Sequence, residues 1–138
     1  MKTIEEILRL AAPLEPSASI RIHNPPWKDL IIEDLHRRGP GGWSIYAIAE
    51  CDEHEERFPL MLFEILSGRD LFKMTPLSLC RDISSKVEEC ATENHGCWMI
   101  LNHLQESHSK FAKSWDKKLR KRGYVEAFQD MQRRGATE

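Results

Sequence analysis

The segment from Trp98 to Arg122 has the clearest periodicity in the chain and predicts its longest helix. Apolar residues recur in it at intervals of three, four and seven, which places them along one stripe of a helix. These residues are Leu101, Leu104, Phe111, Ala112, Trp115 and Leu119. Because a helix in a folded protein is stabilised mainly by packing its apolar face, the rest of the chain has to provide a surface for this stripe. We expect Phe111, Trp115 and Leu119 to be buried against a β-sheet.

Short apolar or alternating runs, separated by turn residues, predict strands before position 76. The expected strands are 18–24, 27–35, 43–50, 58–65 and a short edge strand at 71–74. The second run fits a buried strand or one face of a short helix, and we favour the strand because Ile31 and Ile32 are β-branched. The capping-box spacing of Thr3 and Glu6 predicts a first helix from about Ile4 to Ala12.

The period changes after Pro76, where helices are expected. They are a helix at 79–91, the long helix, and a short final helix at 125–132 before a charged tail. Ile83, Val87 and Ala91 have helical spacing, and the turn residues 94–96 separate this helix from the long one. Strands followed by helices indicate an α+β fold. We therefore predict a four- to five-stranded antiparallel sheet packed against a long C-terminal helix, with a short N-terminal helix.

Length and composition favour one globular domain. A chain of 138 residues with 41% hydrophobic and 30% charged residues can bury a core without disulfides. The expected parts are an N-terminal helix and linker at 1–16, the sheet at 18–75, a helical layer at 79–132 and a tail at 133–138. No apolar run approaches the roughly 18 residues of a membrane span, and the N-terminus does not resemble a signal peptide, so we expect a cytoplasmic protein.

Several segments together resemble a family of small uncharacterised domains found in bacterial plasmids, phages and integrative elements. The matching segments are Ile20–Trp27, Leu30–Glu33, Gly39–Gly42, Phe63–Ile65, Phe111–Asp116 with Leu119, and Gly123–Ala127. The resemblance covers most of the chain and implies a shared fold, but the family has no assigned function. The chain departs from the family pattern at the hairpin after residue 50, where the relatives have a longer, glycine-containing acidic loop.

This hairpin contains an acidic run. Four carboxylates and one imidazole are contiguous at Asp52, Glu53, His54, Glu55 and Glu56. Such a cluster can collect a hard cation or raise the pKa of the histidine. The alternative is a solvated hairpin tip, which we favour because adjacent loop residues seldom converge on one ion. The run also lacks the spacing and central glycine of a calcium loop.

Cysteine and histidine side chains do not have the spacing of a known site. The nearest set is Cys80, Cys90, His95, Cys97 and His103, which contains no Cys-x-x-Cys pair. We expect reduced cysteines that are mostly buried, no metal and no cofactor. His108 lies at the edge of the apolar stripe, where a core histidine with one hydrogen bond is expected. No catalytic constellation is recognisable, so we predict that the protein is not an enzyme.

The strongest candidate for a functional surface is basic. Residues 109–134 contain nine Lys or Arg against three acids, a balance of +6, whereas the remaining chain has eleven bases against nineteen acids, a balance of −8. On a helix, Lys110, Lys113, Lys117 and Lys121 share one ridge, with Arg120 beside them. The ridge fits a solvated helix face, a nucleic-acid backbone or an acidic protein surface. The pI of 6.3 is low for a dedicated nucleic-acid domain.

From these features we predict a non-enzymatic interaction module of a bacterial mobile element. It would bind a protein partner, as an anti-defence inhibitor in one version of the hypothesis. The alternative is a nucleic-acid-binding accessory protein that uses the basic helix. Trp27, Trp43 and Tyr124 are the expected aromatic anchors of a protein interface, if they are exposed. No membrane contact is expected, and the oligomeric state is left open.

Overall fold

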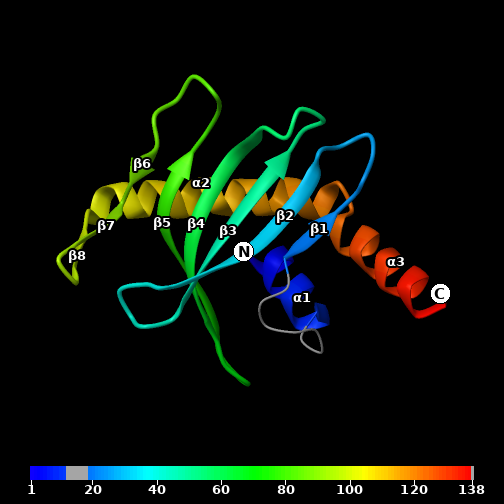
Figure 1. Ribbon diagram of the computed structural model, residues 1–138, viewed down its shortest axis with the longest axis horizontal. Helices are drawn as coiled ribbons and strands as arrows, with labels where there is room; N and C mark the ends of the chain where they lie inside the picture. The colour runs from blue at the N-terminus through cyan, green and yellow to red at the C-terminus, as the bar shows by residue number, and fades with distance from the viewer. Residues whose placement is uncertain (12–18, 138) are drawn as a thin grey trace.

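The computed structural model describes residues 1–11 and 19–137 and contains a six-stranded sheet, a β-hairpin and three helices within them (Figure 1). The helices are α1 (Lys2–Ala11), α2 (Asn102–Lys121) and α3 (Tyr124–Thr137). The strands are β1 (Ile20–Ile22), β2 (Asp29–Arg38), β3 (Ser44–Cys51), β4 (Arg57–Ser67), β5 (Phe72–Cys80), β6 (Glu88–Glu89), β7 (Ala91–Asn94) and β8 (Cys97–Ile100). The α+β class is confirmed. The expected helix end at Ala12 and strand start at residue 18 lie outside the described residues.

The main sheet is an antiparallel meander in which β1 to β6 follow one another in chain order. It has more strands than the four or five expected. The short edge strand predicted at 71–74 is instead the nine-residue strand β5, which continues through Pro76. Proline is tolerated there because the register with β4 shifts at this point: Phe63 lies opposite Pro76, whereas Leu62 lies opposite Ser78.

The helix predicted at 79–91 is absent, and this part of the prediction was wrong. Ile83 and Val87, whose spacing indicates the apolar stripe of a helix, are 68% and 59% exposed. Residues 81–87 form a loop, because the Asp82 carboxylate accepts hydrogen bonds from the hydroxyls of Ser84 at 2.6 Å and Ser85 at 2.9 Å. Such side-chain bonds to nearby residues favour turns over helices.

The turn residues after this loop belong to a hairpin. His95 and Gly96 both have positive φ angles, of 53° and 82°. Two such residues form the tight turn that joins β7 and β8. Because β8 includes Trp98, the long helix begins at Asn102 rather than at Trp98. The expected helical layer at 79–132 is therefore strand and loop up to residue 100.

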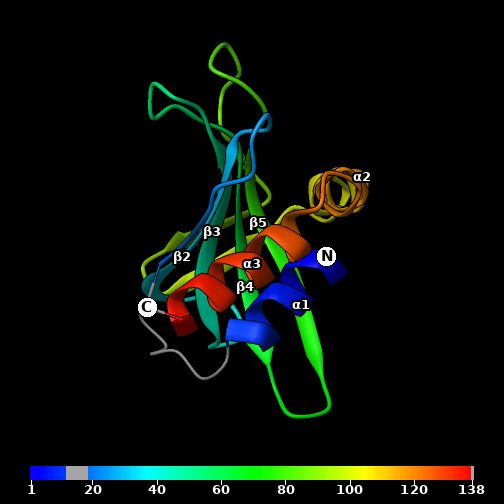
Figure 2. The same ribbon diagram turned by 90° about the vertical axis from the view of Figure 1, so that its right-hand side faces the viewer.

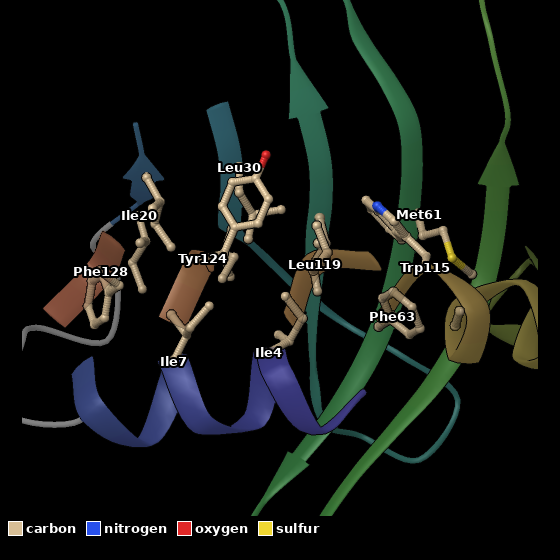
Figure 3. Close-up of a cluster of buried hydrophobic side chains, with 14 of the residues drawn as sticks. Ile4, Ile7, Ile20, Leu30, Met61, Phe63, Trp115, Leu119, Tyr124 and Phe128 are labelled. Atoms are coloured by element: carbon tan, nitrogen blue, oxygen red, sulfur yellow. The ribbon is translucent and has the colours of Figure 1, made fainter. Parts of the chain in front are cut away.

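The three helices pack on one face of the sheet, and the β7–β8 hairpin packs on the other (Figure 2). Figure 3 shows the main core, in which side chains from all three helices meet those of the sheet. Trp115 and Leu119 of α2 are buried in it, as predicted, whereas Phe111 is half-buried. A smaller cluster under the hairpin joins Trp98 to Ile45 and other apolar residues of the sheet.

The final helix is longer than the predicted 125–132. Gly123 has a φ of 81° and separates α2 from α3, because a glycine in this left-handed conformation commonly ends a helix. Among the described residues, no helix combines the length and the apolar character needed to cross a membrane.

Candidate functional site

A groove of about 530 Å³ lies between α2, the start of α1 and strands β4 and β5. We call it the α2–β5 groove. Its apolar lining comes from Met1, Phe63, Met74, Pro76 and Ala112, and its polar lining from Lys2, Glu106, Ser109, Lys110, Lys113, Asp116 and Lys117. Phe63, Pro76 and Ala112 are buried, whereas the α2 lysines are exposed, so the groove has an apolar floor and a basic rim.

Three of the predicted ridge lysines belong to this rim. Lys110, Lys113 and Lys117 follow one another at intervals of three and four along α2, so their side chains lie on one side of the helix. Within residues 1–11 and 19–137, the structure shows no ion pair or hydrogen bond to any of their three ammonium groups. Their positive charge is therefore available to a ligand.

The other predicted ridge residues are placed elsewhere. Arg120 forms an ion pair with Glu6 of α1 at 2.9 Å, which uses its charge within the molecule. Lys121 is exposed but does not line the groove. Only Lys110, Lys113 and Lys117 of the predicted ridge therefore line the groove.

The carboxylates of the groove only partly balance its lysines. The Asp116 carboxylate accepts a hydrogen bond from the backbone N–H of Thr3 at 2.9 Å. Thr3 lies in the first turn of α1, where backbone N–H groups have no partner within the helix, so Asp116 satisfies one of them. Glu106 is exposed and lines the groove together with four lysines, Lys2 included. The rim therefore has a net positive charge.

The predicted aromatic anchors are not brought together. Trp27 and Trp43 are 45% and 42% exposed, but they lie in the loops at opposite ends of β2. Tyr124 is fully buried, so it does not meet the condition of exposure on which its role as an anchor depends. Its hydroxyl donates to the backbone carbonyl of Lys28 and ties α3 to the β1–β2 loop. Tyr124 lies at the junction of α2 and α3, where the periodicity of the sequence did not predict its burial.

Trp27 is already in contact with a cation. The guanidinium of Arg122 lies 4.4 Å from the centre of its ring, and the same group forms an ion pair with Glu50 at 2.8 Å. One face of this indole is therefore occupied within the molecule, which makes it a weaker interface candidate than its exposure suggests.

The acidic hairpin loop is held by its own contacts. The Asp52 carboxylate accepts hydrogen bonds from the backbone N–H groups of Glu56 at 3.0 Å and His54 at 2.9 Å, which lower the pKa of Asp52. Glu55 forms an ion pair with Arg21 at 3.0 Å, and this hydrogen-bonded contact lowers the pKa of Glu55. Glu53 points to solvent with 88% of its side chain exposed. The four carboxylates do not converge, and no cluster in the described part of the chain has the ligands for a metal ion.

A family model described as "Domain of unknown function (DUF6908)" matches residues 2–125, from α1 to the start of α3. The chain belongs to this family. No curated protein and no solved structure matches it. The resemblance to an uncharacterised domain is thus confirmed, and the DUF6908 family gives no function with which to interpret the groove.

Three of the four cysteines of this DUF6908 domain are buried, and Cys97 is exposed. Burial raises the pKa of Cys90 to about 11. Burial also raises the pKa of Cys51, as does its hydrogen bond to Glu55. The thiolate that a nucleophilic cysteine needs is therefore disfavoured at Cys51 and Cys90 near neutral pH.

Two charged clusters of the DUF6908 domain were missed by the sequence reasoning. His108 is fully buried on α2 with the single hydrogen bond expected of it, to Glu88 at 3.0 Å, and Glu88 also meets Arg81 at 3.5 Å. Near the acidic hairpin loop, Asp29 forms an ion pair with Arg21 and a hydrogen bond with the His23 ring, both at 2.8 Å. Alternation along β1 could have indicated that Arg21 and His23 share a face, but not which strand lies beside them.

Proposed function

We propose that the protein is a non-enzymatic interaction module that binds an acidic and partly apolar segment of a protein partner in the α2–β5 groove. The observation that supports this proposal is the combination of three lysines that have no partner in the described chain with a buried apolar floor. Charge complementarity would select an acidic partner and increase its association rate. The apolar floor would bury its aliphatic or aromatic side chains.

The apolar floor favours a protein over a nucleic acid as the ligand. A phosphate backbone would use the ammonium groups of Lys110, Lys113 and Lys117 but would leave Phe63 and Met74 without a counterpart. A peptide with acidic and apolar side chains would use both parts of the groove. Its volume of about 530 Å³ is also within the usual range of ligand pockets.

Binding rather than catalysis fits the chemistry of the groove. Its titratable side chains are lysines and the carboxylates of Glu106 and Asp116, and Asp116 is engaged by Thr3. Nucleophilic catalysis requires a nucleophile hydrogen-bonded to a base; the groove lining contains no cysteine or histidine, and within the described residues no hydrogen bond joins the Ser109 hydroxyl to a basic side chain.

The resemblance to domains of plasmids, phages and integrative elements suggests where the partner comes from. We propose a host or element-encoded protein as the source of the bound segment. Inhibition of a host defence protein is the role that such a complex would serve on a mobile element. Identification of the partner is required to test this part of the proposal.

Selection from a random peptide display library tests the proposed function without a known partner. Wild-type protein is expected to enrich peptides that contain Asp or Glu together with large apolar residues. The double substitution Lys113→Glu/Lys117→Glu should abolish their binding. Lys118→Glu/Lys121→Glu is the matched control, because both lysines are exposed on the same helix and neither lines the groove.

Two results would contradict the proposal. Enriched peptides without acidic residues, or peptides that bind both double variants equally, would place recognition outside the groove. Salt-sensitive binding of a DNA or RNA oligonucleotide that both double variants weaken would instead favour the nucleic-acid alternative, because a phosphate backbone would follow the whole ridge.

A further inference from the structure

One edge of the main sheet is open beside the α2–β5 groove. Strand β5 pairs with β4 along its length, but on its other side β6 covers only Ser78 and Leu79. The preceding carbonyl of Pro76 also has partners there, because it accepts hydrogen bonds from the Gln105 amide at 3.0 Å and from the Cys90 thiol at 3.1 Å. Residues 72–75 have no partner strand on this side within the described chain.

The hairpin geometry shows which backbone groups face outward along this edge. The N–H of Gly68 donates to the carbonyl of Leu71 at 2.7 Å at the β4–β5 turn. In an antiparallel pair, hydrogen-bonded and non-hydrogen-bonded positions alternate from such a bond. Lys73 and Thr75 therefore pair with β4, whereas Phe72 and Met74 direct their N–H and C=O groups away from it. The outward carbonyl of Pro76 agrees with this alternation.

The open edge borders the groove itself. Met74 and Pro76 of β5 line the groove together with Lys110 and Lys113 of α2. Figure 2 shows that the β4–β5 hairpin extends well beyond α2, so the helix does not cover the whole strand. A strand edge beside a helix is a common peptide-binding arrangement, in which backbone bonds provide affinity and alternate side chains provide specificity.

We propose that the groove binds its partner as an extended segment that pairs with β5 at Phe72 and Met74. Alternate side chains of this segment would enter the groove, apolar ones against Met74 and acidic ones beside Lys110 and Lys113. This inference rests on the proposed function and adds the conformation of the ligand. An unpaired edge strand is otherwise a site of aggregation, so a partner strand would also protect it.

The test uses a synthetic nine-residue peptide and the full chain. The peptide has threonine at every other position and Glu, Val, Val and Glu at the positions between, so that one face of its strand matches the groove. Its binding is expected to slow amide hydrogen exchange by at least about tenfold at Phe72 and Met74, because their N–H groups become hydrogen-bonded. Exchange at Lys73 and Thr75, which already pair with β4, should change little.

Backbone methylation of the peptide supplies a matched pair of controls. One peptide is N-methylated only at threonine residues. The other is N-methylated only at Glu and Val residues, and both carry the same number of methyl groups. In a paired strand only one of these sets of N–H groups faces β5. We expect one methylated peptide to bind like the parent and the other to lose at least tenfold in affinity. Equal behaviour of the two peptides would overturn strand pairing.

A helical control separates this inference from the proposed function. A peptide with the same number of Glu and Val residues at helical spacing should bind weakly or not at all. If it binds in a manner that requires Lys113 and Lys117, without protection of Phe72 and Met74, strand pairing is wrong and the proposed function survives. If neither peptide binds, strand pairing is also wrong, and the display selection decides the proposed function independently.

Discussion

Trp115 shows how a single residue joins the layers of this molecule. Its side chain is 3% exposed and lies between α2 and the sheet, near Met61 and Phe63 (Figure 3). Its indole N–H has no hydrogen-bond partner among the described residues. The residue therefore contributes through packing and apolar burial rather than through a polar contact.

Replacement of this side chain should have a large effect. Trp115→Ala is expected to lower the free energy of unfolding by about 3–5 kcal/mol, because it leaves a large cavity in the core. Trp115→Phe should cost less, since it retains a ring and removes an unpaired N–H group. Urea denaturation of both variants measures the difference, and an unchanged midpoint for Trp115→Ala would contradict the packing described here.

A second residue-scale prediction concerns pH. The hydrogen bond from His108, with a contribution from Arg81, lowers the pKa of the Glu88 carboxyl. A carboxyl whose pKa is lower in the folded state stabilises the fold above its unfolded pKa, and this stability is lost as the pH falls through the folded value. The melting temperature should therefore decrease as the pH is lowered below about 4. Between pH 7 and pH 3, the Glu88→Gln variant should lose less stability than wild-type protein, and thermal melts over this range measure the difference. Equal losses in the two proteins would contradict a stabilising contact between Glu88 and His108.

At the scale of elements, the prediction of secondary structure failed where side-chain hydrogen bonds favour a turn although the apolar residues have helical spacing. The alternation of β3 and the apolar stripe of α2 are long patterns, and both elements were recognised. In the segment 79–100, the spacing of Ile83 and Val87 suggested a helix, but hydrogen bonds to Asp82 and the hairpin turn at Gly96 decided otherwise. Short elements depend on such turn chemistry more than on periodicity.

The β7–β8 turn gives a direct test of this explanation. Gly96→Ala is expected to lower the free energy of unfolding by about 1 kcal/mol, because a side chain at a φ of 82° is strained even with open space around it. Gly135→Ala is the matched control, since this glycine lies in α3 and also has open space. There the change should be neutral or should stabilise by up to about 1 kcal/mol. Equal effects at the two sites, measured by urea denaturation, would contradict the turn.

At the scale of the whole molecule, the basic and acidic segments of the sequence lie in different parts of the fold. The basic segment 109–134 includes the rim lysines that α2 contributes to the groove, whereas the acidic hairpin loop at 52–56 lies between β3 and β4. Arg120 and Arg122 are paired with Glu6 and Glu50, so these two of the nine basic side chains of this segment are used within the fold. Lys110, Lys113 and Lys117 are the part of this charge that lies beside an apolar groove.

Ionic strength should therefore control binding at the groove. Affinity for the acidic nine-residue peptide is expected to fall several-fold between 50 and 500 mM NaCl, because the Debye length decreases from about 14 to about 4 Å. Titration calorimetry at several salt concentrations measures this dependence. For Lys113→Glu/Lys117→Glu, which is expected to abolish binding, no binding of this peptide should be detected at 50 mM NaCl. Affinity that is independent of salt in wild-type protein would exclude a role for the lysine charges.

The sequence by itself determined the α+β class, the order of the sheet strands before the two C-terminal helices, the burial of Trp115 and Leu119, and the exposed lysines of α2. These follow from patterns within single elements. Only the tertiary structure decided that Tyr124 is buried, that β5 continues past Pro76, and that part of the lysine ridge borders an apolar groove. The groove joins β4 and β5 to a helix about forty residues further along the chain, and such contacts depend on the packing of all the elements between them.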